Sequence, residues 1–330
     1  MNDTRRGEAR GHVVALCGGI GGAKLALGLS HAVPGEQLVI AVNTGDDFEH
    51  LGLHISPDID TVVYTLAGIV NTESGWGRAE ESWCFMEALA MLGGEAWFRL
   101  GDKDLATHVE RTRRLRAGES LSTVTAGIRK RLGVKACVLP MSDDPVRTTV
   151  ETGEGVLPFQ HYFVRRRCEP EVRAVFYAGA DAARLQPDIA HALASPHLWA
   201  VILCPSNPYL SLGPMLAIPG MREALTRSAA PVIAVTPLVG GQAVKGPMAK
   251  IMNELGIDRT PASIAGFYDG LIDGFILDRA DAASASDMDL PIVIEQTVMV
   301  TLEDRIALAN ACLSFADRLA GDGSRKERVA

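Results

Sequence analysis

The chain has 330 residues, of which 47% are hydrophobic and 22% charged, as in ordinary soluble globular proteins. Its 40 acidic and 32 basic side chains give a net charge of −8, which excludes a general affinity for nucleic acid but allows one local phosphate pocket. No apolar run approaches the ~20 residues that a membrane-spanning helix needs. Residues 1–11 are polar and lack the apolar central region of a signal peptide. The six cysteines form no CxxC pair, so we expect free thiols and a cytoplasmic protein.

Strand and helix patterns alternate along the chain. A strand is expected at 12–17, a helix at 23–30, a strand at 38–43 and a helix at 58–68, and further strands at 136–139, 172–177, 199–204, 231–235, 274–277 and 291–295. Helical patterns lie between most of these strands. The alternation predicts an α/β fold with a Rossmann-like, mostly parallel sheet and helices on both of its faces.

The middle of the chain departs from this alternation. Helical patterns follow one another at 80–91, 105–116 and 121–131, and a β-hairpin is expected from 148–151 and 156–165. We therefore predict a core made of residues 12–70 and 171–320, with a helical and hairpin insertion at 71–170. The ends, 1–11 and 321–330, are polar and are expected to be disordered.

A glycine-rich segment directly follows the first strand and opens the first helix. It holds four glycines and a lysine: Gly18, Gly19, Gly21, Gly22 and Lys24. Lys24 stands where a GxGxxG fingerprint, counted from Gly19, has its third glycine, and Leu25 stands where a P-loop has Ser or Thr. The segment therefore predicts binding of a phosphate or diphosphate at a helix N-terminus, and the alternative is a tight turn without a ligand.

Carboxylates follow the second strand. Asp46 lies in the loop Asn43–Asp47, where an acid can hold a ribose hydroxyl or Mg²⁺, or simply form an Asx-turn. Asp58 and Asp60 lie at the start of the next predicted helix. Asp58 is interpreted as a helix cap, and Asp60 as an additional carboxylate in the first turn.

Several other loops carry polar side chains after predicted strands. Arg99 precedes a helix, Ser206 and Asn207 offer hydroxyl and amide groups, and the Lys245–Gly246 loop can neutralise a phosphate. Trp76 lies between two glycines, where an aromatic ring either stacks on a flat ligand or anchors the loop. Together these loops favour a nucleotide diphosphate with a metal, the setting of phosphoryl transfer.

These motifs, in this order, resemble one family. The 2-phospho-L-lactate transferases of coenzyme F-420 biosynthesis (CofD and FbiA type) are similar over nearly the whole chain. The resemblance rests on Gly18–Lys24, Val42–Asp47, Ser56–Thr61, Gly75–Gly77, Leu100–His108, Leu139–Asp144 and Pro205–Pro208.

The resemblance implies an enzyme that transfers a substituted phosphate group. The donor would be a guanosine-diphosphate-linked three-carbon acid: phospholactyl, phosphoenolpyruvyl or phosphoglyceryl. The acceptor would be the ribityl hydroxyl of the deazaflavin Fo, held under the insertion, and GMP would leave. Mg²⁺ and a homodimer are also implied.

By motif position, the resemblance also assigns residues. Asp60 and Arg99 match residues that contact Fo, and Trp76 is expected to stack on it. Asp46 matches a metal-associated acid. The glycine segment, Ser206–Asn207 and Lys245–Gly246 match the nucleotide side.

The expected mechanism uses few groups. Asp46 and Asp60 hold Mg²⁺, one of them takes the hydroxyl proton, and Arg99 orients Fo or the reacting phosphate. Two alternatives remain. One is a non-catalytic, nucleotide-sugar-binding regulator of the gluconeogenesis-factor type, and the other is an NAD-dependent dehydrogenase with Asp46 on the ribose.

Overall fold

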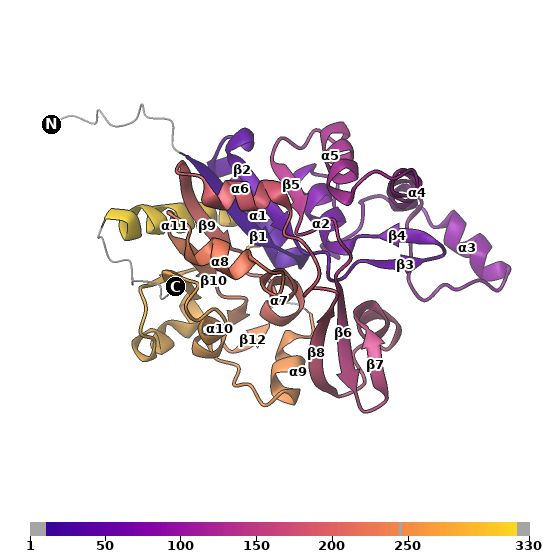
Figure 1. The fold of residues 1–330 in the computed structure, drawn as a ribbon. Helices are drawn as coiled ribbons and strands as arrows, with labels where there is room; N and C mark the ends of the chain where they lie inside the picture. Colours follow the sequence, from indigo (N-terminus) through magenta and orange to yellow (C-terminus); the bar gives the residue numbers. More distant parts are fainter. Residues whose placement is uncertain (1–10, 244–245, 322–330) are drawn as a thin grey trace.

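The fold is seen in a computed structural model that describes residues 11–243 and 246–321 (Figure 1). Its core is a seven-stranded sheet in the order β14-β13-β10-β9-β1-β2-β5, and all neighbouring strands are parallel. The predicted Rossmann-like α/β class is therefore confirmed. The strands are β1 (His12–Cys17), β2 (Leu38–Val42), β5 (Cys137–Pro140), β9 (Leu198–Leu203), β10 (Val232–Val235), β13 (Gly274–Asp278) and β14 (Ile292–Glu295).

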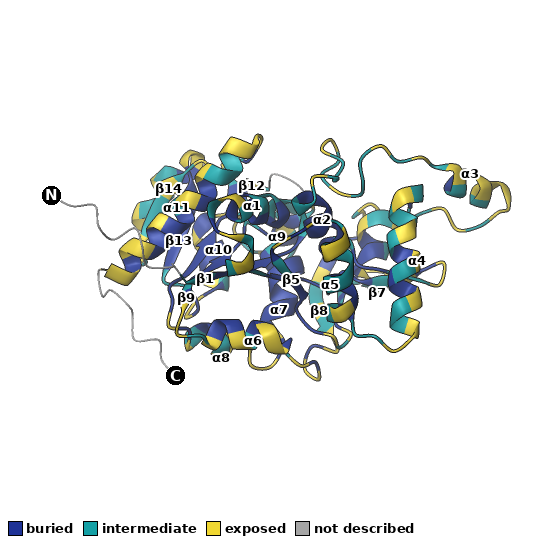
Figure 2. Ribbon diagram, turned by 90° about the horizontal axis from the view of Figure 1, so that it is seen from above, coloured by how far each residue is buried: buried dark blue, intermediate teal, exposed yellow. Residues whose placement is uncertain are grey.

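Alternate residues of the strands pack into two apolar cores, one on each face of the sheet. In β1, Val13 and Ala15 lie in one core, whereas Val14 and Leu16 lie in the other. Because successive side chains of a strand point to opposite faces, an unbroken apolar run indicates a strand covered on both sides. Helices α1 (Gly19–Ala32), α2 (Pro57–Leu66) and α11 (Leu302–Gly321) cover the first face, and α6 (Pro187–Ala194), α8 (Met221–Thr226) and α10 (Pro261–Phe267) cover the second (Figure 2).

Smaller sheets and further helices lie at one end of the core. A three-stranded antiparallel sheet has the order β7-β6-β8, and β3 pairs with β4 in a short hairpin. In Figures 1 and 2, α3 projects from the body of the molecule. The remaining α-helices and strands of the described residues are β3 (Phe48–His50), β4 (Leu53–Ile55), α3 (Cys84–Met91), α4 (Asp102–Arg116), α5 (Leu121–Arg131), β6 (Arg147–Thr152), β7 (Gly155–Pro158), β8 (Val172–Ala178), α7 (Gly213–Leu216), β11 (Leu238–Val239), β12 (Gln242–Ala243) and α9 (Met248–Glu254).

The predicted limits of the insertion need correction at two strands. β5 lies inside the expected insertion, 71–170, yet it forms the edge of the core sheet beside β2. Conversely, β8 was expected in the core but pairs with β6. A short apolar run predicts a strand but does not specify which strand pairs with it, because tertiary packing decides the pairing. The second hairpin strand is also shorter than expected, since β7 ends at Pro158.

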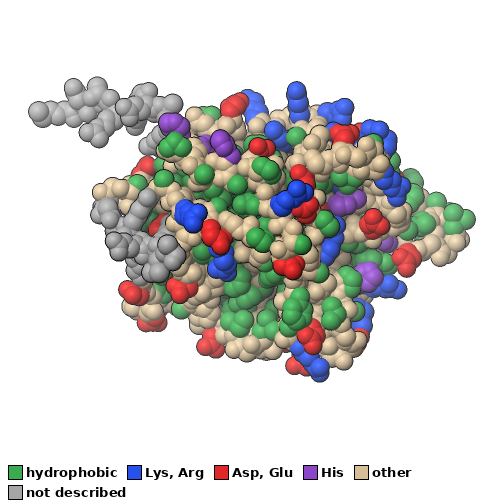
Figure 3. Space-filling view, in the orientation of Figure 1, with side chains coloured by type: hydrophobic (Ala, Val, Ile, Leu, Met, Phe, Trp, Pro, Cys, Tyr) green, Lys and Arg blue, Asp and Glu red, His purple; other side chains and the backbone are tan. Residues whose placement is uncertain are grey.

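The predicted disordered ends lie outside the described residues, apart from Gly11 and Gly321, the last residue of α11. None of the described helices combines the length and apolarity that crossing a membrane requires. On the face drawn in Figure 3, basic and acidic side chains are interspersed rather than gathered by sign.

Candidate functional site

The candidate site lies at the carboxyl ends of β1 and β2, which are neighbours in the half of the sheet that ends at β5. The glycine-rich segment leaves β1 and the Asn43–Asp47 loop leaves β2. Parallel α/β sheets bind ligands at this edge, because the loops there converge and helix N-termini point toward it.

Asn43 joins two carboxyl groups at this edge. Its side-chain amide donates to Asp46 Oδ1 at 3.2 Å and to Asp58 Oδ2 at 2.9 Å. All three side chains are buried. The other oxygen of Asp58 accepts a hydrogen bond of 2.8 Å from the backbone amide of Gly19. Asp58 thus does cap a helix, but it is α1 that receives the cap and not its own helix α2.

The two carboxyl groups share an unfavourable environment for negative charge. Burial raises the pKa of Asp58 to about 6, although Asn43 and the Gly19 amide act in the opposite direction. Burial, with the charge of Asp58, raises the pKa of Asp46 well above its usual range. A cation bound between two such groups would favour their ionised forms. Their chemistry therefore fits a hard divalent cation with oxygen ligands.

The glycines of the first segment allow close packing beside these carboxyls. A Cβ on Gly21 would lie 2.4 Å from the carbonyl oxygen of Pro205, and one on Gly22 would lie 2.5 Å from Ser206 Oγ. The Gly18 amide donates to Ser206 Oγ at 3.1 Å. The amides of Gly18 and Gly19 are thus already hydrogen-bonded within the protein. Binding of a phosphate by this segment therefore stays a prediction.

Three of the other residues expected on the nucleotide side, Lys24, Ser206 and Asn207, have structural partners. Ser206 also donates to the Gly18 carbonyl at 2.9 Å, and the Asn207 side chain accepts from the amides of Tyr209 and Leu210 at a helix start. Lys24 Nζ donates to the carbonyl of Met299 at 2.8 Å. Lys245 lies outside the described residues, and Gly246 is an exposed residue with a φ of +79°.

Asp60 belongs to a second polar cluster, which we call the Asp60 cluster: Asp60, Tyr64, Asp104, His108 and Arg111. Both carboxylate oxygens of Asp60 accept from the guanidinium of Arg111, one of them at 3.0 Å. His108 lies 3.7 Å from Asp60 and 3.3 Å from Asp104, and the Tyr64 hydroxyl donates to Asp104 at 2.7 Å. Residues two apart on a helix point in different directions, so Asp58 and Asp60 have different partners.

Asp60, Asp104 and His108 are also spaced as a metal site would be. One ligand atom from each lies within 4.8 Å of the others. The guanidinium of Arg111, however, already neutralises Asp60 and would repel a second cation. Asp58 is therefore the better companion for Asp46, and the role of Asp60 as a metal ligand stays a prediction.

Arg99 and Trp76 lie on the segments around α3. Arg99 is exposed, and its guanidinium stacks 4.1 Å from the ring centre of Trp83. Trp76 is 50% exposed between two glycines of positive φ. A Cβ on Gly75 would lie 2.9 Å from the Ile20 side chain, so this loop packs against the glycine-rich segment. Trp76 is thus an exposed aromatic ring beside the site, whereas Asp60 has Arg111 and not Arg99 as its cation.

Part of the motif from Leu100 to His108 serves local structure. The Asp102 carboxylate accepts from the amides of Cys84 and Phe85, each at 3.1 Å, and so begins α3. Glu81 does the same for α4, because it accepts from the amides of Lys103 and Asp104. Such exchanged caps fix two helices relative to each other.

Comparison with known proteins identifies the relatives of this fold and site. Residues 13–309 match the family described as 2-phospho-L-lactate transferase CofD. The chain belongs to this family. The resemblance predicted from the motifs is thereby confirmed.

Named members of the CofD family are similar over almost their full length. A phosphoenolpyruvate transferase of Streptomyces griseus is 39% identical, over 93% of this chain and 99% of that protein. A 2-phospho-L-lactate transferase of Methanocaldococcus jannaschii is 36% identical, over 93% and 99%. A solved structure of a upf0052 family member from Bacillus halodurans has a TM-score of 0.61 at 15% identity, covering 92% of this chain and 99% of that one, and shows the fold alone.

Sequence reasoning missed two parts of this site. Asn43 was part of a motif but was given no role, although a buried amide between two acids is what joins Asp46 to Asp58. The sequence places Arg111 in a predicted helix at 105–116 and His108 at the end of the motif Leu100–His108, but it assigns neither side chain a chemical role. A fully buried arginine almost always has a partner, so the burial of Arg111 would have indicated one. The sequence of α4 is polar, however, and nothing in it distinguishes the buried Arg111 from the exposed arginines.

Proposed function

We propose that this chain transfers a phosphorylated three-carbon acid from a guanosine-diphosphate-linked donor to Fo, in coenzyme F-420 biosynthesis. The ribityl hydroxyl of Fo forms a new bond to the phosphorus that carries the acid, and the bond from that phosphorus to GMP breaks. The hydroxyl proton is lost, and a phosphodiester and GMP are the products. Membership of the CofD family supports this role, and no comparison supports a non-catalytic regulator.

One observation of the structure carries the proposal. Asp46 and Asp58, both buried, meet at Asn43 beside the glycine-rich helix start, where the carboxyl ends of β1 and β2 adjoin. Paired oxygen ligands next to a helix N-terminus suit a metal and a diphosphate together. A protein that only bound a nucleotide sugar would have no need for two buried acids whose charge is unfavourable.

Asp46 and Asp58 are the residues that would hold Mg²⁺ in this proposal. When bound, Mg²⁺ would neutralise charge on the diphosphate as GMP departs. The chain itself contributes Asn43, which holds both carboxyls in place, and the Gly19 amide, which orients Asp58. One of the site's carboxylates, Asp60 included, accepts the hydroxyl proton.

Fo is proposed to lie on the side of Trp76. The ring of Trp76 offers a face for stacking, and its loop packs on Ile20 of the glycine-rich segment. Arg99 and Asp60 are proposed to contact Fo, with Arg111 holding Asp60 in position. The remaining nucleotide-side residues predicted from the sequence complete the proposal: Gly18, Gly19, Gly21, Gly22, Lys24, Ser206, Asn207, Lys245 and Gly246.

The acid on the donor is the open part of the proposal. The relatives carry two names, phosphoenolpyruvate transferase and 2-phospho-L-lactate transferase, so both acids are candidates, together with phosphoglycerate. The six cysteines are free, as expected in a reducing cytoplasm, where we place the reaction.

A donor panel tests this function. The purified protein is incubated with Fo, Mg²⁺, GTP, one three-carbon phosphate at a time and a guanylyltransferase that makes the donor. Mass spectrometry then detects the Fo phosphodiester. Product with one acid supports the transferase and names its donor, and D46N and D58N should abolish it. Stabilisation by UDP-sugars, with no Fo binding and no product, would instead indicate the regulator.

A further inference from the structure

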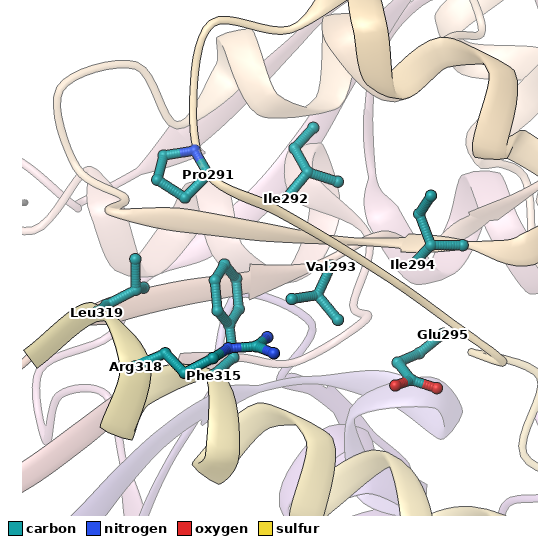
Figure 4. A pocket seen from close by; sticks show the side chains of 8 residues that line it. All are labelled: Pro291, Ile292, Val293, Ile294, Glu295, Phe315, Arg318 and Leu319. Atoms are coloured by element: carbon teal, nitrogen blue, oxygen red, sulfur yellow. The ribbon is translucent and has the colours of Figure 1, made fainter. Parts of the chain in front are cut away.

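The surface has pockets other than the candidate site, and one of them is strongly charged. A groove between β14 and α11 has largely apolar walls, which include Ile292, Phe315 and Leu319 (Figure 4). A different pocket, of about 640 Å³, lies between α4 and α5, and all of its lining side chains but one glycine are charged. We call it the α4–α5 pocket, and its lining residues are Glu110, Arg113, Arg114, Glu119, Gly127, Lys130 and Arg131.

The segment that forms the α4–α5 pocket is basic in a chain that is acidic overall. Residues 110–135 contain eight basic and two acidic side chains, although the whole chain has a net charge of −8. The helix dipole favours bases in the last turn of a helix, which accounts for those of α4 and of α5 taken separately. The dipole does not require that both sets line one pocket, where like charges repel each other.

Two glutamates compensate only part of the positive charge in this pocket. Glu110 accepts hydrogen bonds of 2.8 Å and 2.9 Å from Arg113, and Glu119 accepts one of 3.0 Å from Arg114. The side chains of Lys130 and Arg131 are exposed, and no ion pair among the described residues includes either of them. With four basic and two acidic lining residues, the pocket keeps a surplus of positive charge.

Arg114 is already held in place in this pocket. A Cβ on Gly127 would lie 2.3 Å from Arg114 Nη1, so the glycine lets the guanidinium lie against the backbone of α5. The same nitrogen donates to the carbonyl of Val124 at 3.4 Å, and the Arg114 side chain is 12% exposed. A cation that is fixed before a ligand arrives loses little conformational entropy on binding.

We propose that the α4–α5 pocket binds a small molecule that carries two or more phosphate groups. Guanidinium groups match phosphate oxygens with parallel hydrogen bonds, and lysine adds a compact point charge. The phosphates lie between the arginines of α4 and the Lys130–Arg131 pair of α5, and they neutralise the surplus charge. The pocket volume, about 640 Å³, falls within the range of roughly 300–1,000 Å³ that is usual for small-molecule sites.

This pocket lies on a different face of α4 from the Asp60 cluster. Residues three or four apart share a helix face. Asp104, His108 and Arg111 share the face that forms the cluster. Glu110 and Arg114 share another face, which lines the pocket. The inference is therefore independent of the proposed function, and its test requires no transfer activity.

Calorimetric titration of the full chain with tripolyphosphate tests the pocket. Mg²⁺ is left out and EDTA is added, so that the candidate site carries no cation for the phosphates. One molecule should bind per chain, and K130Q/R131Q should weaken binding at least ~tenfold, because it removes two charge-assisted contacts. E110Q should tighten binding, since it removes an acid from the pocket and frees Arg113.

The matched control is R116Q/K135Q, which removes two exposed basic side chains of the same segment that do not line the pocket. It should change the affinity by less than ~threefold, because the solvent screens these more distant charges. Circular dichroism and the melting temperature of each variant show that the chain remains folded.

A second titration, with GDP, identifies the source of the phosphates. Similar affinities for GDP and tripolyphosphate, both lost in K130Q/R131Q, show that the pocket recognises the phosphate chain alone. Much tighter binding of GDP, also lost in K130Q/R131Q, shows that it recognises a nucleotide.

The proposal is wrong if folded wild-type protein binds neither ligand. It is also wrong if K130Q/R131Q binds both as the wild type does. Binding of several molecules per chain, weakened equally by the two double variants, would overturn it as well, because that result indicates diffuse attraction to a basic surface.

Discussion

The buried ion pair between Arg111 and Asp60 yields a quantitative prediction. Arg111 is 1% exposed, and the side chain of Asp60 is 8% exposed. Although burial acts to lower it, the charge and hydrogen bonds of Asp60 raise the pKa of Arg111, so the guanidinium stays ionised. Removing one partner of such a pair leaves a buried charge without compensation, which costs about 3–5 kcal/mol. We therefore expect Arg111→Met to lower the free energy of unfolding by about that amount.

A double-mutant cycle measures the pair itself. R111M, D60L and the double variant are compared with the wild type by urea denaturation. Because the double variant leaves no unpaired charge, its cost should fall at least ~2 kcal/mol short of the sum of the two single costs. Arg113→Met is the control on the same helix, since Arg113 pairs with exposed Glu110 and should lose less than ~1 kcal/mol. Additive costs for R111M and D60L would refute the reasoning.

Three further predictions concern the site. Because the pKa of Asp58 is raised to about 6, the folded state binds its proton more tightly than the unfolded state. Stability should therefore fall by roughly 2 kcal/mol between pH 4 and pH 6, and urea titrations should show this fall reduced in D58N. Gly21→Ala should lose ~1–3 kcal/mol by overpacking against Pro205, whereas Gly266→Ala, with open space around it, should change stability by less than ~1 kcal/mol. Trp76→Ala should raise KM for Fo roughly tenfold or more and change kcat little, because a stacked aromatic ring contributes about 1–3 kcal/mol; an unchanged KM would exclude stacking.

Local signals account for what the sequence could predict. The unbroken apolar runs of β1, β2 and β9 are flanked by turn residues, and this pattern alone predicts a parallel sheet. The glycine-rich segment and Asn43–Asp47 follow their strands directly, so their place at the carboxyl edge follows from the topology.

Partners distant in the sequence account for what could not be predicted. Arg111 lies 51 residues beyond Asp60, and nothing in the polar helix α4 marks this one arginine as buried. Asp58 resembled an ordinary cap because its true partners, Gly19 and Asn43, lie on other loops. Likewise β5 and β8 have clear strand patterns, but only packing decides which sheet each one joins.

The stoichiometry of a single reaction tests the central claim most directly. The protein is incubated with Fo, Mg²⁺ and a purified guanosine-diphosphate-linked three-carbon acid, and GMP and the Fo phosphodiester are then quantified in the same sample. The account predicts equal amounts of the two products from the wild type and neither from D58N. GMP released without the phosphodiester, or no product from folded protein that binds Fo with any of the three acids, would contradict it.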